Sequence, residues 1–178
     1  YQAVSGSGMK GKKDLAEGIN GKAPEAYPHP IYNNVLPHID VFLENGYTKE
    51  EQKMIDETRK ILNVPDLKVT ATCARVPVQD SHSVEIDVTL EKEATAEDIK
   101  ALFDQDDRVV LVDNPENNEY PMAINSTNKD EVFVGRIRRD DSLENTFHVW
   151  CTSDNLLKGA ALNAVQVLEQ VMRLKGAN

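Results

Sequence analysis

An arginine and a histidine lie close together in the stretch TCARVPVQDSHSVEIDV, residues 72–88. Arg75 carries a planar fork of N–H donors that suits a carboxylate or a phosphate. His82 carries an imidazole, the side chain best suited to moving protons near neutral pH. The two are seven residues apart, and on an unbroken strand that spacing puts their side chains on opposite faces. If they serve one site, the chain must bend between Pro77 and Ser81.

Each of these residues also has a simpler interpretation. Arg75 lies among small and apolar residues, where an unpaired guanidinium is costly. It therefore needs an anionic partner, which is either a carboxylate of the chain itself or a carboxylate of a ligand. For His82 the simpler interpretation is a surface histidine on a turn.

Two further groups of charged residues can also be interpreted either as part of a site or as ordinary surface residues. Glu50 and Lys53 are three residues apart in a predicted helix, so they are neighbours that form either a weak exposed ion pair or part of a site. In the segment GRIRR, strand alternation puts Arg136 and Arg138 on one face. For these two arginines we favour solvation or an interface over catalysis.

The cysteines and histidines do not predict a metal site. The four histidines are scattered, and neither Cys73 nor Cys151 belongs to a C-x-x-C pair. His148 and Cys151 face opposite ways on a predicted strand, which argues against a Cys-His nucleophile built from them. We expect both cysteines to be buried, reduced thiols of a cytoplasmic protein.

Composition restricts the class of protein. The chain has 178 residues, 40% of them hydrophobic, which suits an ordinary globular core. Its formal net charge of −10 argues against nucleic acid or an anionic membrane as the main partner, because both demand a basic surface. A small anionic ligand needs only a local cluster of Arg and Lys. No apolar run approaches the length that spans a bilayer.

The first half of the chain is expected to be mostly irregular. The glycines and serines of YQAVSGSGMKGKK predict a loop, and residues 19–37 are rich in Pro, Gly and Asn. A helix follows over residues 48–62, with Thr48 as N-cap and Glu51 completing a capping box.

Strands dominate the remainder. We predict strands at Leu67–Val76, Ser83–Glu91, 108–113, 131–139 and 146–153, a short helix over 95–103 and a long closing helix from Asp154 to Gly176. Because most strands follow one another directly, the predicted class is α+β with a largely antiparallel or mixed sheet and helices packed on one face.

Several stretches in one order resemble a known family. YQAVSGSG, NNVLPHID, YTKEEQKMIDETRKIL, TATCARVPV, DEVFVGRIRRD and SDNLLKGAALNAVQ are similar to the C-terminal part of aspartate-β-semialdehyde dehydrogenase. The resemblance implies a fold like the C-terminal domain of glyceraldehyde-phosphate dehydrogenase. It also implies a substrate-binding and dimerisation domain over 1–152 and a helix over 153–178 that packs on a nucleotide-binding domain.

The family enzyme reduces β-aspartyl phosphate to aspartate β-semialdehyde with NADPH, on the route to lysine, threonine, methionine and diaminopimelate. The resemblance implies that His82 is the general acid/base and that Arg75 holds the substrate α-carboxylate. It further implies that Glu50 holds the α-amino group of the substrate and that Lys53 helps to bind the phosphate. Gln2 would orient the substrate or the acyl intermediate. The residues near the nicotinamide would be Ser5, Gly6 and Asn155.

The family's nucleophilic cysteine lies in an Asn-Cys motif upstream of the Tyr-Gln-Ala stretch. Cys73 and Cys151 do not match that motif, and the domain that binds most of the NADP also lies upstream in the family. We therefore expect residues 1–178 alone to show no dehydrogenase activity. The resemblance also implies that the enzyme is a homodimer whose interface is built mostly from this region.

Two alternatives stay open at this point. One is a dimerisation module of the same fold without catalytic function. The other is the related reductase of N-acetyl-γ-glutamyl phosphate, which Glu50 disfavours because an acetylated amine needs no carboxylate partner.

Overall fold

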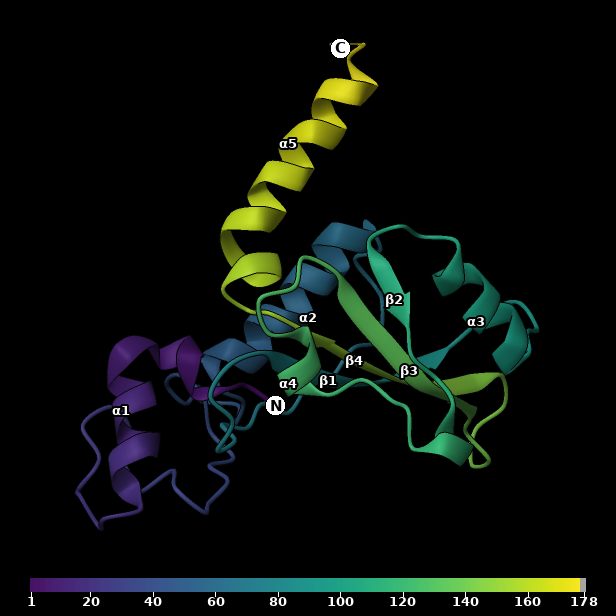
Figure 1. The fold of residues 1–178 in the computed structure, drawn as a ribbon. Coiled ribbons are helices and arrows are strands. Elements are labelled where there is room, and N and C mark those ends of the chain that lie inside the picture. The colour runs from purple at the N-terminus through teal and green to yellow at the C-terminus, as the bar shows by residue number, and fades with distance from the viewer. Residues whose placement is uncertain (177–178) are drawn as a thin grey trace. The chain divides into compact units, whose positions relative to one another are not determined.

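A computed structural model describes residues 1–176. The chain divides into two compact units, Tyr1–Gln79 and Asp80–Asn178 (Figure 1). The expected division into a substrate-binding and dimerisation domain (1–152) and a helix that packs on a nucleotide-binding domain (153–178) stays a prediction. Residues 177 and 178 of that segment lie outside the described residues.

The first unit contains a 3₁₀ turn and two helices. These are η1 (Val4–Ser7), α1 (Gly8–Gly18) and α2 (Lys49–Leu62). Val4, Ile31 and Leu36 form a small buried core, against which Leu15 and Tyr27 pack. Residues 19–37 contain no helix or strand, as their Pro, Gly and Asn content predicted.

The prediction of a loop at the N-terminus is wrong, because residues 8–18 form α1. Tertiary packing overrides the low helix propensity of glycine here. Gly11 faces the core so closely that a Cβ atom would lie 2.4 Å from the Tyr27 hydroxyl and 2.5 Å from the Val4 carbonyl oxygen. The glycine is therefore required by contact and does not signal flexibility.

Helix α2 begins as predicted. The Thr48 side chain accepts a hydrogen bond from the Glu51 N–H, and the Glu51 carboxylate accepts one from the Thr48 N–H. The helix ends at Leu62 and is followed by Asn63, whose φ of 55° is left-handed. Among the apolar residues of α2, Ile55 is buried, whereas Ile61 is exposed.

The predicted strand Leu67–Val76 is also wrong. Its backbone is extended, but it forms only isolated bridges, from Arg75 to Gln2 and to Leu36. A run of strand-forming residues becomes a strand only where a neighbouring strand completes a ladder, and within this unit the pairing stops after one residue.

The predicted bend between the arginine and the histidine is present. The backbone bends at Pro77, Gln79 and Asp80, and Ser81 has a φ of 70°, in the left-handed region that side chains seldom adopt. The chain therefore changes direction within this stretch, as required if Arg75 and His82 are both functional.

The second unit is built on a four-stranded sheet. Its elements are β1 (His82–Thr89), α3 (Ala96–Asp104), β2 (Val109–Leu111), η2 (Pro115–Asn117), α4 (Ala123–Ser126), β3 (Val132–Arg139), β4 (Thr146–Ser153), η3 (Leu157–Ala161) and α5 (Leu162–Leu174). The strand order is β1-β4-β3-β2. Two pairings are antiparallel, and β2 runs parallel to β3, which confirms the predicted mixed sheet in an α+β fold.

Helix α3 packs on β2 and β3 and closes the core of this unit. Ile99 of the helix meets Val134, Ile137, Phe147 and Val149 of the sheet. The apolar residues of β1 differ in burial: Val88 packs against this core, but Val84 is 36% and Ile86 42% exposed. Strand β1 is at the edge of the sheet, away from the strands that α3 covers.

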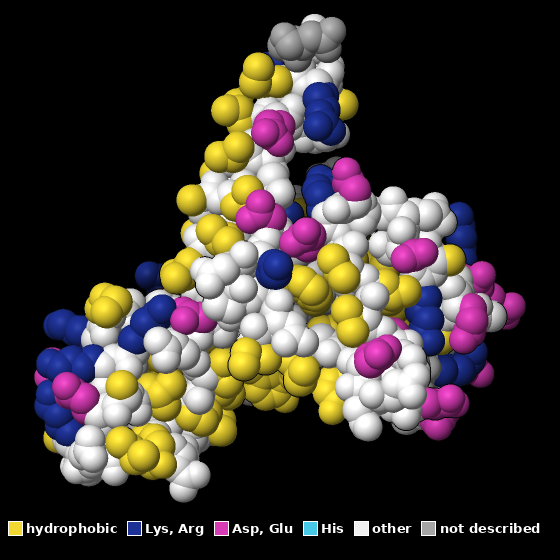
Figure 2. Space-filling model, in the orientation of Figure 1, with side chains coloured by type: hydrophobic (Ala, Val, Ile, Leu, Met, Phe, Trp, Pro, Cys, Tyr) yellow, Lys and Arg dark blue, Asp and Glu magenta, His cyan; other side chains and the backbone are white. Residues whose placement is uncertain are grey.

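The closing helix is not continuous, contrary to the prediction. A π-helical turn, η3, precedes α5, and the helical backbone breaks at Ala160. Gly176 has a φ of 69°, the conformation expected just after a helix. Along α5, hydrophobic side chains remain at the surface (Figure 2), including Val165, Leu168, Val171, Met172 and Leu174. No helix among residues 1–176 combines the length and apolar character that crossing a bilayer requires.

Candidate active site

Three of the predicted site residues contact one another in the first unit. The Gln2 side-chain amide donates to Glu50 Oε1 over 2.8 Å, and Lys53 Nζ donates to Glu50 Oε2 over 3.4 Å. Glu50 and Lys53 follow the N-cap of α2, whereas Gln2 comes from the start of the chain. The carboxylate of Glu50 is thus shared between an amide and an ammonium group.

Main-chain hydrogen bonds place Arg75 beside this group. The Gln2 N–H donates to the Ala74 carbonyl over 2.8 Å, and the Val76 N–H donates to the Gln2 carbonyl over 3.1 Å. On its other side Arg75 exchanges both main-chain hydrogen bonds with Leu36, at 2.8 and 3.0 Å. The arginine is therefore held between two segments that are distant in sequence.

The Arg75 side chain is buried, with 6% of the residue exposed. Its Nη1 donates to the Ala3 carbonyl over 2.7 Å, and its guanidinium carbon lies 5.9 Å from the centre of the Tyr27 ring. Burial lowers the pKa of the guanidinium, while the nearby Tyr27 and Glu50 act to raise it. Within residues 1–176 no carboxylate forms an ion pair with Arg75.

Ser5 and Gly6 lie in η1, next to this group. The Ser5 N–H donates to the Gln79 carbonyl over 3.0 Å, and Ser5 is buried. Gly6 is exposed and has no side chain, so its backbone is open to an approaching molecule.

His82 and Asn155 belong to the second unit, and one residue connects them. Asn155 Oδ1 accepts a hydrogen bond of 3.2 Å from the N–H of Ser81, the residue before His82. Ser81 is itself buried, and its hydroxyl lies 3.0 Å from that of Thr127. These contacts hold the left-handed Ser81 and thereby fix the first residue of β1.

The segment that carries Asn155 is organised by the buried Asp154. Its Oδ1 accepts from the Leu156 N–H and its Oδ2 from the Asn128 N–H, each over 2.8 Å. Asp154 thus holds the turn to a second loop, and Asn155 holds it to Ser81.

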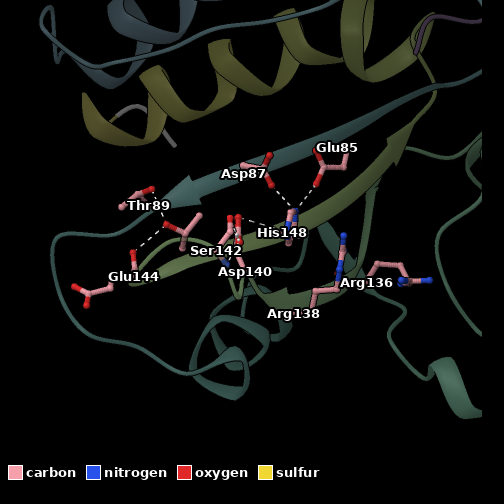
Figure 3. A network of polar contacts seen from close by, with 10 residues as sticks. Glu85, Asp87, Thr89, Arg136, Arg138, Asp140, Ser142, Glu144 and His148 are labelled. Atoms are coloured by element: carbon pink, nitrogen blue, oxygen red, sulfur yellow. Dashed lines mark hydrogen bonds and ion pairs between the residues drawn. The ribbon is translucent and has the colours of Figure 1, made fainter.

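A second polar cluster lies on the exposed face of the sheet (Figure 3). His148 Nδ1 lies 2.8 Å from Glu85 and also contacts Asp87, and Nε2 lies 3.7 Å from Asp140. Hydrogen bonds from the Ser142 hydroxyl and N–H lower the pKa of Asp140. This cluster was not predicted, because it depends on the register that sets Asp87 opposite His148.

Next to that cluster, the sheet carries a pocket of about 530 Å³. Its lining includes Glu85, Arg136, Arg138, Tyr120, Met122 and Trp150. Arg136 has a φ of 54° at an irregularity of β3, where Asp113 accepts from the N–H groups of Arg136 and Ile137. Simple alternation therefore fails at this point, although both arginines still line one pocket.

The cysteines behave as structural thiols. Both are free, and Cys73 is buried. Burial raises the pKa of Cys151 to about 11, and burial together with Glu50 and Glu51 raises that of Cys73. Cys151 packs against the core that α3 covers, whereas His148 lies in the exposed cluster, so the two face opposite ways as predicted.

Over residues 1–158 the chain matches the family described as semialdehyde dehydrogenase, dimerisation domain, and it belongs to that family. Among curated proteins it is 48% identical to the aspartate-semialdehyde dehydrogenase of Aquifex aeolicus, over 97% of this chain and 53% of that protein. It is 46% identical to the Bacillus subtilis enzyme of the same name, over 98% of this chain and 54% of that protein.

The solved structures agree with this assignment. The chain is similar to aspartate semialdehyde dehydrogenase II from Vibrio cholerae at a TM-score of 0.89 and 39% identity, over 97% of this chain and 53% of that one. The same protein has been solved in complex with ASA. The chain thus spans about half the length of the relatives it matches.

Proposed function

We propose that the chain is the substrate-binding and dimerisation part of an NADP-dependent enzyme that reductively dephosphorylates β-aspartyl phosphate to aspartate β-semialdehyde. This substrate carries an α-amino group, an α-carboxylate and a phosphate. A site for it needs an anion for the first group and cations for the other two.

The observation that carries the proposal is the grouping of Gln2, Glu50, Lys53 and Arg75 in the first unit. Glu50 contacts both Gln2 and Lys53, and the main chains of Gln2 and Arg75 are paired. We assign Glu50 to the α-amino group and Lys53 to the phosphate. Gln2 orients the substrate or the acyl intermediate.

Arg75 supports the proposal because its buried guanidinium forms no ion pair with a carboxylate within residues 1–176. Its buried guanidinium contacts a carbonyl oxygen and an aromatic ring but no carboxylate within residues 1–176. Glu50 is the internal carboxylate that acts to raise the pKa of Arg75, but it forms its hydrogen bonds with Gln2 and Lys53. We assign Arg75 to the α-carboxylate of the substrate, for which its fork geometry is suited.

We assign His82 as the general acid/base, since an imidazole can exchange protons near neutral pH. Its support is the fixed position of the preceding Ser81, which Asn155 and Thr127 hold. A residue that transfers a proton must sit within hydrogen-bond reach of the reacting group, and a rigid neighbour limits its motion.

The proposed cofactor is NADP, which supplies or accepts the hydride when bound. Ser5, Gly6 and Asn155 are assigned to the nicotinamide end. The exposed backbone of Gly6 is compatible with close approach of a ring. The aspartate semialdehyde dehydrogenase of Candida albicans, which shares this fold at 22% identity and a TM-score of 0.66, has been solved with NADP.

We further propose a homodimer, in keeping with a dimerisation-domain family. The segment 153–178 is proposed to pack on a nucleotide-binding domain. The support for this packing is that apolar side chains of α5 are exposed to water in the isolated chain. Sedimentation of residues 1–178 tests the dimer: a monomer at high concentration would contradict it.

The experiment that tests the function uses the complete reading frame. The purified protein is assayed with aspartate β-semialdehyde, phosphate and NADP, and in parallel with N-acetylglutamate γ-semialdehyde. We expect turnover of the first substrate, and at least about tenfold lower kcat/KM for the acetylated one, because Glu50 then lacks its ammonium partner. Equal or greater activity toward the acetylated substrate would overturn the assignment.

A further inference from the structure

Glu51 is a buried carboxylate that the proposed chemistry does not use. It is 7% exposed, although it lies between Glu50 and Lys53, which are assigned to the substrate. A glutamate at the third position of a helix normally closes a capping box and faces water. Its burial therefore calls for a second reason.

The second reason is a bond to a distant segment. Glu51 Oε2 accepts from the Thr48 N–H over 2.7 Å, which closes the capping box. Glu51 Oε1 accepts from the Cys73 N–H over 2.8 Å. Burial acts to raise the pKa of Glu51, but the two main-chain donors outweigh it and leave the pKa lowered. One ionised side chain thus ties the start of α2 to the segment that leads to Arg75.

The geometry of the proposed substrate explains why the hydrogen bond between Glu51 and Cys73 would matter. The α-amino and α-carboxylate groups sit on one carbon atom, so the distance between their partners must be constant. Glu50 is on the helix and Arg75 on the other segment, and Glu51 joins the two. Displacement of either partner lengthens its contact with one of these two groups and so weakens substrate binding.

We infer that Glu51 is a positioning residue that sets the spacing between Glu50 and Arg75 and so selects an α-amino acid substrate. The inference rests on the proposed function. Only a carboxylate serves this role fully, because each of its two oxygens accepts from one N–H. An amide offers one oxygen and turns an NH₂ group toward the other donor.

The test compares two cap substitutions in the complete protein. In Glu51→Gln we expect KM for aspartate β-semialdehyde to rise about tenfold, the effect of one lost hydrogen bond to a charged group, with kcat changed less than about threefold. The matched control is Asp98→Asn. Asp98 has the same capping-box position in α3 and accepts from Thr95 only, so this variant should leave KM unchanged.

Amide hydrogen exchange at Cys73 tests the tie without any variant. We expect strong protection, since its N–H is bound in a buried place. An unprotected Cys73 amide would overturn the inference, and so would an unchanged KM in Glu51→Gln. If the unaltered protein fails to turn over aspartate β-semialdehyde, the proposed function fails, and the inference fails with it. If the unaltered protein is active and Glu51→Gln matches it, only the inference fails.

Discussion

The side-chain amide of Gln2 donates to the carboxylate of Glu50 over 2.8 Å, although 48 residues separate them. The contact brings the start of the chain to the first turn of α2, where Glu50 also receives Lys53. A carboxylate that already has an amide and an ammonium neighbour is oriented before any ligand arrives. A ligand ammonium group would then meet a fixed anion, which reduces the entropy cost of binding.

Arg75→Lys should weaken substrate binding. Lysine keeps the positive charge but loses the planar fork, and it cannot also donate to the Ala3 carbonyl and stack near Tyr27. We expect kcat/KM of the complete enzyme to fall by about 10- to 100-fold, in line with the loss of a hydrogen bond to a charged group. Steady-state kinetics measure the change, and an unaltered kcat/KM would contradict the assigned contact.

Local signals in the sequence predicted the elements that depend on neighbouring residues. The capping box at Thr48 begins α2 as expected, because the side chain and the N–H it meets are three residues apart. The short helix predicted from residue 95 likewise begins with Thr95 as its N-cap. The bend before Ser81 was also predictable. Arg75 and His82 are seven residues apart, so a straight strand would place their side chains on opposite faces, and a proline lies between them.

Features set by distant contacts could not be predicted in this way. Helix α1 contains three glycines, and Gly11 lies so close to Tyr27 and Val4 that a side chain there would clash. The segment Leu67–Val76 has the composition of a strand but lacks the partner strands that would complete it. Likewise, the contact of Glu51 with Cys73 spans 22 residues, and nothing in the pattern around either residue indicates it.

Gly11→Ala should destabilise the protein. The added Cβ would lie 2.4 Å from the Tyr27 hydroxyl and 2.5 Å from a main-chain oxygen, so the core of the first unit must move. We expect a loss of about 1–3 kcal/mol in the free energy of unfolding, measured by urea denaturation. The control Gly159→Ala meets only Asn155 Cβ at 3.9 Å and should stay within about 0.5 kcal/mol. Equal effects would contradict the packing argument.

Stability should fall in acid partly through Glu51. Its pKa in the folded protein is lowered from 4.5, so its ionised form stabilises the protein above that pH. This contribution is lost as pH falls below 4.5 through the folded pKa. The difference in unfolding free energy between the unaltered protein and Glu51→Gln should therefore be larger at about pH 7 than at about pH 3. A difference that does not vary with pH would contradict the stated role.

Cys151 should react slowly with iodoacetamide. Burial raises its pKa to about 11, so very little thiolate exists at neutral pH. In the folded protein we expect the alkylation rate to rise about tenfold per pH unit above neutrality. In urea the reaction should be fast at the same pH. Mass spectrometry of the modified peptide measures the rate, and rapid modification of folded protein at about pH 7 would contradict the expectation.

The role of His82 as general acid/base is tested most directly by comparing the complete enzyme with its His82→Ala variant. Both are assayed with aspartate β-semialdehyde, phosphate and NADP. If His82 transfers the proton, kcat should fall by about 10²- to 10⁴-fold, while circular dichroism shows an unaltered fold. An unchanged kcat in His82→Ala would contradict the account.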